Sequence, residues 1–116
     1  MLRDDESLID IERAAQRILR YARGIERSDL ETNDEKVSAI LYQIAIIGEA
    51  VKRFSIEFRQ QNFEIPWGET AGMRNVIVHE YDQIDLDVIW DVIHNKLPEL
   101  LNLLQPLLPK NDTGEK

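Results

Sequence analysis

The stretch that decides the fold is Val37-Ser38-Ala39-Ile40-Leu41-Tyr42-Gln43-Ile44-Ala45-Ile46-Ile47, in which apolar residues recur at steps of three and four. The pattern continues beyond it, and its full set of apolar positions is Val37, Ile40, Leu41, Ile44, Ile47, Val51, Phe54 and Phe58. This spacing is typical of a helix buried in a bundle. Thr32 as the cap with Glu35 three residues later indicates a capping box, so we expect a long helix from there to about Gln61.

Helices are also expected on both sides of this segment. The first runs from about Asp5 to Glu26 and a third from about Glu69 to His79. A last helix follows a cap at Asp85 and is kinked or split by Pro98, because proline lacks the N–H that a helix interior requires. No strand, repeat or linker is expected. The sequence therefore predicts an all-α, up-down bundle of four to five helices, with residues 1–109 as one domain and 110–116 as a flexible tail.

The composition narrows the chemistry. The 116 residues are 43% hydrophobic and 31% charged, which suits one folded domain with a real core. The absence of cysteine excludes disulfides, thiolate catalysis and cysteine-based zinc sites. No apolar run approaches the ~18 residues of a membrane span, and the first residues lack the apolar run of a signal peptide. A cytoplasmic protein that does not enter membranes is expected.

A second informative segment is Arg74-Asn75-Val76-Ile77-Val78-His79-Glu80-Tyr81. Arginine binds phosphate oxygens bidentately, and histidine is the side chain best suited to move protons near neutral pH. No cysteine or cluster of metal ligands accompanies them. This combination suits phosphate-ester chemistry without a metal, and therefore RNA, whose 2′-hydroxyl supplies its own nucleophile.

The spacing Arg74-x-x-x-x-His79-x-Tyr81 resembles the signature of the HepT toxins, a branch of the HEPN superfamily. The flanking segments 47–53, 65–67 and 71–73 agree, and the resemblance extends from about Leu8 to Leu108. It implies a dimeric HEPN-like helical domain. It also implies a metal-independent endoribonuclease that is the toxin of a toxin–antitoxin pair, with Arg74 and His79 as catalytic residues and no cofactor.

The resemblance implies a partner as well. In the HepT branch a minimal nucleotidyltransferase antitoxin of the MntA type adenylylates the tyrosine that corresponds to Tyr81 and so silences the ribonuclease. Such a modification is physically reasonable here, because AMP adds bulk and negative charge where an RNA phosphate must dock. The RNA target, a transfer RNA or a messenger RNA, stays open.

The reaction itself indicates a homodimer. RNA transesterification needs a base for the 2′-hydroxyl, an acid for the leaving 5′-oxygen and a cation at phosphorus. One imidazole cannot begin in both protonation states, so a two-fold axis near His79 would supply two. Asn75 would support by orienting a phosphate oxygen or an imidazole. In an ideal helix Arg74 and His79 lie about 140° and about 7.5 Å apart, so the arginine must reach or the helix must end near His79.

The net charge of −8 repels RNA at long range, so any contact with RNA must be local. The first helix offers an arginine stripe within an arc of about 120°. Its members are Arg13, Arg17, Arg20, Arg23 and Arg27. The stripe is either a solvated face or a contact surface for RNA or a partner, with Arg13, Arg17 and Arg20 as the candidate residues.

Two other functions remain open on the sequence alone. The chain could be a non-catalytic helical module that binds a nucleotidyltransferase partner or a nucleotide phosphate through Arg74 and His79, or a purely structural dimer. The aspartates that follow the motif suit helix caps and solvated faces better than a metal site; they are Asp82, Asp85, Asp87 and Asp91. We expect structural roles for His94, Trp67 and Trp90.

Overall fold

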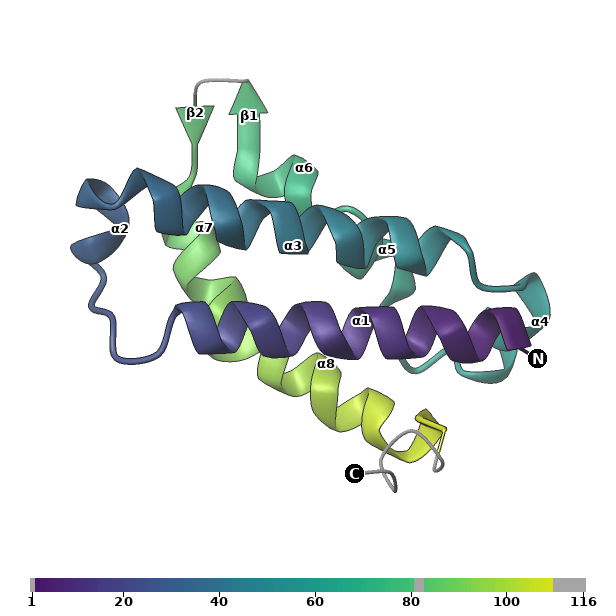
Figure 1. The fold of residues 1–116 in the computed structure, drawn as a ribbon. Helices are drawn as coiled ribbons and strands as arrows, with labels where there is room; N and C mark the ends of the chain where they lie inside the picture. Colours follow the sequence, from purple (N-terminus) through teal and green to yellow (C-terminus); the bar gives the residue numbers. More distant parts are fainter. Residues whose placement is uncertain (1, 81–82, 110–116) are drawn as a thin grey trace.

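Two long antiparallel helices form the axis of the protein. A computed structural model describes residues 2–80 and 83–109, which are mostly helical, as expected. Helix α1 (Leu2–Tyr21) and helix α3 (Asp34–Lys52) lie side by side and run in opposite directions (Figure 1). The short helix α2 (Asp29–Thr32) lies in the connection between them.

The core lies between α1, α3 and the C-terminal helices. Apolar residues that recur at helical spacing along one side of α1 are buried, and Ala22, directly after the helix, is buried with them; they are Ile11, Ala14, Ala15, Ile18 and Ala22. From α3 and the later elements the core takes Ile40, Ile44, Ile47, Ile77, Ile89, Leu97 and Leu104. Burial of each large aliphatic side chain contributes about 1.5–3 kcal/mol. The apolar pattern thus locates the core correctly.

The first helix ends earlier than expected. It ends at Tyr21, not near Glu26, and the turn that follows contains Gly24 with a φ of 76°. This left-handed conformation strains residues that carry a Cβ atom, so glycine suits the turn. Lys36 Nζ donates to the partly buried carbonyl of Tyr21, so a side chain 15 residues later satisfies this helix end. The cap of α3 is also corrected by one residue, because Asn33, not Thr32, accepts from the backbone N–H of Lys36, at 3.0 Å.

The long second helix is divided. Helix α3 ends at Lys52, and a separate helix, α4 (Ile56–Gln61), follows, so the expectation of one helix to Gln61 is wrong. Ser55 is the cap of α4, and its hydroxyl accepts from the N–H of Phe58 at 3.1 Å. The carboxylate of Asp4, on α1, fixes this cap from a position 51 residues away in the sequence. The local spacing of apolar residues in the sequence does not indicate this long-range contact.

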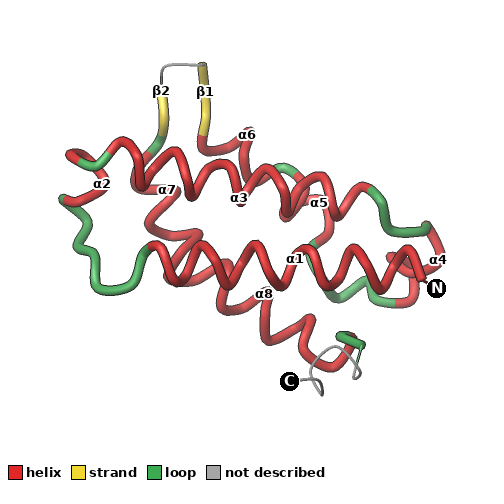
Figure 2. The backbone as a smooth tube through the Cα atoms, viewed as in Figure 1, coloured by secondary structure: helices red, strands yellow, loops and turns green. Residues whose placement is uncertain are grey.

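The expected third helix is also broken, and it continues into a hairpin. Helices α5 (Trp67–Ala71) and α6 (Met73–Ile77) replace the expected span to His79. Strands β1 (Val78–Glu80) and β2 (Gln83–Ile84) follow as an antiparallel pair that projects from the helical body (Figure 2). The expectation of no strand is therefore wrong at this place.

The last helix is split before Pro98, as expected. Helix α7 (Leu86–Asp91) passes into a π-helical turn, η1 (Val92–Lys96), and then into α8 (Leu97–Leu104) and a 3-10 turn, η2 (Gln105–Leu107). Pro98 lacks an N–H group, and the wider turn ahead of it moves the backbone out of the α-helical register that the ring would obstruct. The N–H of Leu97 bonds instead to the carbonyl of Val92.

The other local predictions can now be placed. Asp85 caps α7, as expected, since its side chain accepts from the N–H of Val88. Trp67 is buried beside Phe54, whereas Trp90 is half-buried and contacts the ring of His94. Among the described residues, more helical segments are present than the four to five expected, because three expected helices are each divided. The tail 110–116 lies outside the described residues. No described helix combines the length and the apolarity of a membrane span.

Candidate functional site

Helix α6 presents Arg74 and Asn75 to solvent. Met73 and Ile77 are buried, and they fix the orientation of this short helix on the core. Arg74 and Asn75 lie between them in the sequence and are exposed. None of the side chains that the structure describes forms a hydrogen bond or an ion pair with Arg74. A guanidinium without a carboxylate partner is available for an anion from outside the molecule.

A close approach between two backbones sets the position of α6. A Cβ atom on Gly48 of α3 would lie 3.0 Å from the carbonyl oxygen of Ala71, the last residue of α5. Only glycine leaves room for this contact, so α5 can end directly against α3. The chain then turns at Gly72, whose carbonyl accepts from the N–H of Asn75 at 3.0 Å and starts α6. The sequence analysis assigned no role to Gly48.

The backbone at His79 is irregular. In the hairpin, Val78 pairs with Ile84 and Glu80 pairs with Gln83. The two paired residues are adjacent on β2 but have one residue between them on β1. His79 is therefore the extra residue of a bulge. Bulges bend a strand and redirect a side chain, and they are over-represented next to active sites. The N–H of Asp85 also donates to the carbonyl of Ile77 at 2.7 Å, which fixes the base of the hairpin.

This geometry replaces the helical relation between Arg74 and His79. Because α6 ends at Ile77, the second of the two expected alternatives applies: the helix ends before the histidine. The side chain of His79 and the whole of Tyr81 lie outside what the structure describes. Arg74 and Tyr81 cannot share a helix face, since no helix continues between them.

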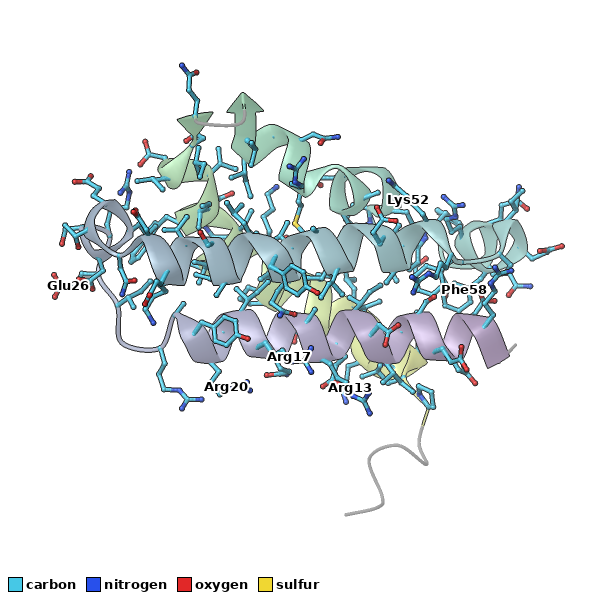
Figure 3. All side chains as sticks on the ribbon, turned by 45° about the horizontal axis from the view of Figure 1, so that its top comes forward. Arg13, Arg17, Arg20, Glu26, Lys52 and Phe58 are labelled. Carbon is cyan, nitrogen blue, oxygen red and sulfur yellow. The ribbon has the colours of Figure 1, made fainter. Side chains whose placement is uncertain are left out.

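The arginines of α1 lie away from this segment. Arg13, Arg17 and Arg20 are exposed on the edge of α1 that faces away from the hairpin (Figure 3). Both α1 and α6 pack against α3, so these arginines and Arg74 belong to separate surfaces of one protomer. Arg27 does not join the stripe, because its guanidinium pairs with Asp87 at 2.7 Å on α7.

Three of the aspartates after the motif have partners within the protein, and Asp82 lies outside the described residues. Asp85 serves as a helix cap, Asp87 receives Arg27, and Asp91 accepts from Asn95 Nδ2 at 2.7 Å. No group of three or more potential metal ligands is present in the part of the chain that the structure describes. The second histidine, His94, is exposed on η1, with Nδ1 3.0 Å from the carbonyl of Trp90.

Sequence reasoning proposed Arg74 and His79 as site residues but did not predict the bulge at His79 within the hairpin. One signal was available: Val76, Ile77 and Val78 are three β-branched residues in succession, which favour a strand over a helix. The partner residue of that strand, Ile84, comes only after a turn, so the pairing itself was not visible in the local pattern.

Comparison with known proteins identifies the family of the chain. The model of the family described as "Ribonuclease HepT-like" matches residues 11–107. A protein of Caldanaerobacter subterraneus subsp. tengcongensis named "Putative RNase" is 34% identical over 80% of this chain and 83% of its own length. A protein of Thermococcus cleftensis named "Probable ribonuclease HepT" is 32% identical over 86% of this chain and 91% of its own length. No solved structure matches the chain significantly. The chain belongs to the HepT-like ribonuclease family.

Proposed function

We propose that this protein is a metal-independent endoribonuclease that acts as a homodimer and as the toxin of a toxin–antitoxin pair. The observation that carries the proposal is the exposed Arg74, without a partner among the described residues, five positions before a histidine that occupies a bulge. An uncompensated guanidinium beside a proton-transfer residue is what RNA transesterification requires.

Arg74 would bind the scissile phosphate and stabilise the charge that grows on its oxygens during attack. Two N–H groups of the guanidinium can contact two phosphate oxygens at once, which an ammonium group cannot do in the same geometry. Asn75, exposed on the same short helix, would donate its amide N–H to a third oxygen or orient the imidazole. Loss of one such electrostatic contact costs about 10²–10³-fold in rate.

His79 from each of two copies would move the protons. One imidazole removes the proton of the 2′-hydroxyl, and the 2′-oxygen forms a bond to phosphorus. The bond from phosphorus to the 5′-oxygen breaks, and the imidazolium of the second copy protonates that oxygen. The products are a 2′,3′-cyclic phosphate and a 5′-hydroxyl, and each histidine ends in the protonation state in which the other began. A dimer is required because each chain contributes one motif histidine.

RNA would be held by local contacts, because the net charge of −8 opposes long-range attraction. Arg13, Arg17 and Arg20 are exposed and form no ion pair with any described residue. We assign them to the flanks of the bound RNA, where they would contact phosphates away from the cut. A transfer RNA or a messenger RNA is long enough to reach both surfaces.

Control of the toxin would act on Tyr81. A nucleotidyltransferase antitoxin would catalyse attack of the tyrosine oxygen on the α-phosphate of ATP, with release of pyrophosphate and of the phenolic proton. The AMP group would then lie two residues from His79 and repel the RNA phosphate. This part of the proposal rests on the family resemblance, and mass spectrometry of protein expressed with and without a minimal nucleotidyltransferase tests it.

The experiment that tests the proposed activity is cleavage of total RNA in EDTA, with intact mass recorded on the same samples. The wild type, His79→Ala, Arg74→Ala and the matched control His94→Ala are compared. We expect cleavage with 2′,3′-cyclic phosphate ends by the unmodified wild type and by His94→Ala. His79→Ala should be slower by about 10²–10⁴-fold, with an unchanged circular dichroism spectrum.

Two results would contradict this mechanism. If EDTA stops cleavage, a metal takes part in the reaction. If wild type of unmodified mass leaves RNA intact, the chain is a non-catalytic module. Arg74 and His79 would then be ligands for a nucleotide phosphate of the nucleotidyltransferase partner, which isothermal titration with AMP would detect.

A further inference from the structure

A pocket of about 310 Å³ lies beside α6. Its lining residues come from α5, α6 and the segment before them, and from α7, η1 and α8. The volume falls at the lower end of the range for ligand-binding pockets. Nothing in the proposed RNA chemistry uses this pocket.

The floor of the pocket is apolar. Met73 and Val76 line it from α6, and Val92, Leu100 and Leu103 line it from η1 and α8. Val76 is 55% exposed, although it is a β-branched aliphatic residue on a helix whose neighbours Met73 and Ile77 are buried. Covering this surface would remove apolar area from water, at about 25 cal/mol per Å².

The rim of the pocket is negatively charged. Four carboxylates and one ammonium line it: Glu64, Glu69, Asp91, Glu99 and Lys96. Lys96 Nζ already pairs with Glu69 at 2.7 Å, and this hydrogen bond raises the pKa of Lys96 above 10.5. Glu64 and Glu99 are exposed and form no ion pair with any described residue. The rim therefore has unneutralised carboxylates, which would attract cations.

We propose that this pocket binds an apolar side chain of a partner protein that is flanked by lysine or arginine. The apolar floor has room for one aromatic or branched aliphatic side chain. The carboxylates lie on different elements around the opening, so the positive charges must flank the anchoring side chain. A short basic segment with a central hydrophobic residue satisfies both conditions.

Occupancy of the pocket would bear directly on the candidate site. Val76 and Met73 lie on α6 on either side of Arg74 and Asn75 in the sequence. A bound side chain would fix this helix of five residues between the partner and the core. The inference does not depend on the ribonuclease proposal, because binding can be measured without RNA.

The probe is the capped peptide acetyl-Gly-Lys-Phe-Lys-Gly-amide, titrated into isotope-labelled full chain and followed by NMR. Two comparison peptides change one property each: glutamate replaces both lysines, or alanine replaces phenylalanine. We expect the lysine–phenylalanine peptide to shift the resonances of Val76, Val92 and Leu103. We expect each comparison peptide to bind at least fivefold more weakly.

Variants of the chain test the two parts of the site. Glu64→Gln combined with Glu99→Gln should weaken the lysine–phenylalanine peptide about fivefold, since each exposed charge pair contributes modestly. Glu57→Gln is the matched control, because Glu57 is an exposed glutamate on α4 outside the pocket, and it should leave binding unchanged.

Three outcomes would overturn the proposal. If the glutamate peptide bound as tightly as the lysine peptide, charge would not contribute to binding. If the alanine peptide bound as tightly, the apolar side chain would not contribute. Shifts of the pocket residues with protein concentration alone, without peptide, would identify a second copy of this chain as the occupant. Analytical ultracentrifugation of the same samples separates that case from peptide binding.

Discussion

The carboxylate of Asp4 receives two hydrogen bonds from Ser55, one from the backbone N–H and one from the hydroxyl, each at 2.9 Å. Asp4 is only 5% exposed, although it lies in the first turn of α1. Ser55 Oγ in turn accepts from Phe58, so one buried carboxylate joins the start of α1 to the start of α4. This contact fixes the corner at which the second expected helix is divided.

Asp4→Ala should therefore destabilise the protein by about 2 kcal/mol, because it leaves the N–H of Ser55 without its partner in a buried place. Asp5→Ala is the matched control: Asp5 lies in the same first turn, and no hydrogen bond to it is present among the described residues. Urea denaturation of both variants measures the difference in free energy of unfolding. Equal losses would mean that the helix dipole, not the contact with Ser55, accounts for the effect.

Gly48→Ala should lower the free energy of unfolding by about 1–3 kcal/mol, because the new methyl group meets the carbonyl oxygen of Ala71, which belongs to a packed backbone. Gly68→Ala is the control, since a Cβ atom there meets nothing within 4 Å. That variant should be neutral or slightly stabilising, as alanine is the better helix former. A Gly48→Ala protein as stable as the wild type would show that α5 can move away from α3 without cost.

Gln43→Met should stabilise the protein by about 1 kcal/mol. Gln43 is 6% exposed, and its Oε1 atom has no hydrogen-bond partner among the described residues. Methionine has a similar shape and removes the cost of a buried, unpaired polar atom. Gln16→Met, on the exposed side of α1, is the control and should leave the melting temperature unchanged. A destabilised Gln43→Met protein would indicate that the amide has a partner in solution.

Replacement of Arg13, Arg17 and Arg20 by alanine should weaken RNA binding and reduce its dependence on salt. Three lost phosphate contacts correspond to a decrease of about 2 in the slope of log affinity against log salt. The control replaces Arg3, Lys52 and Arg53, which are exposed elsewhere and change the net charge by the same amount. Filter binding at several salt concentrations measures both slopes. Identical slopes for the two triple variants would mean that the arginine stripe is a solvated face that does not contact RNA.

The sequence predicted the helical fold because the apolar periodicity that indicates it lies within single segments. It predicted the ends of the helices poorly, because distant residues set several of them. Lys36 satisfies the carbonyl of Tyr21, and Asp4 fixes Ser55. The cap at Asp85 was found because the aspartate and the N–H that it receives are only three residues apart.

The candidate site also has features that local sequence predicts and features that distant residues set. Arg74 and His79 could be proposed from the sequence, because their residue types and spacing suit phosphate-ester chemistry. The bulge could not, since it depends on how Val78 pairs with Ile84 across a turn. The role of Gly48 could not be predicted either, because it depends on the carbonyl oxygen of Ala71, 23 positions later in the chain. Arg27 was wrongly assigned to the arginine stripe, because its partner, Asp87, lies 60 residues away.

The end of α6 at Ile77 changes how the spacing between Arg74 and His79 responds to an inserted residue. In a continuous helix, one inserted residue would rotate the histidine by about 100° away from the arginine. In the extended segment that follows Ile77, successive side chains point to opposite faces, so one inserted residue would reverse the face and two would keep it. A bulge can absorb a single extra residue while the pairs on either side keep their register. The alternation of a strand, not the turn of a helix, therefore governs which insertions this segment tolerates.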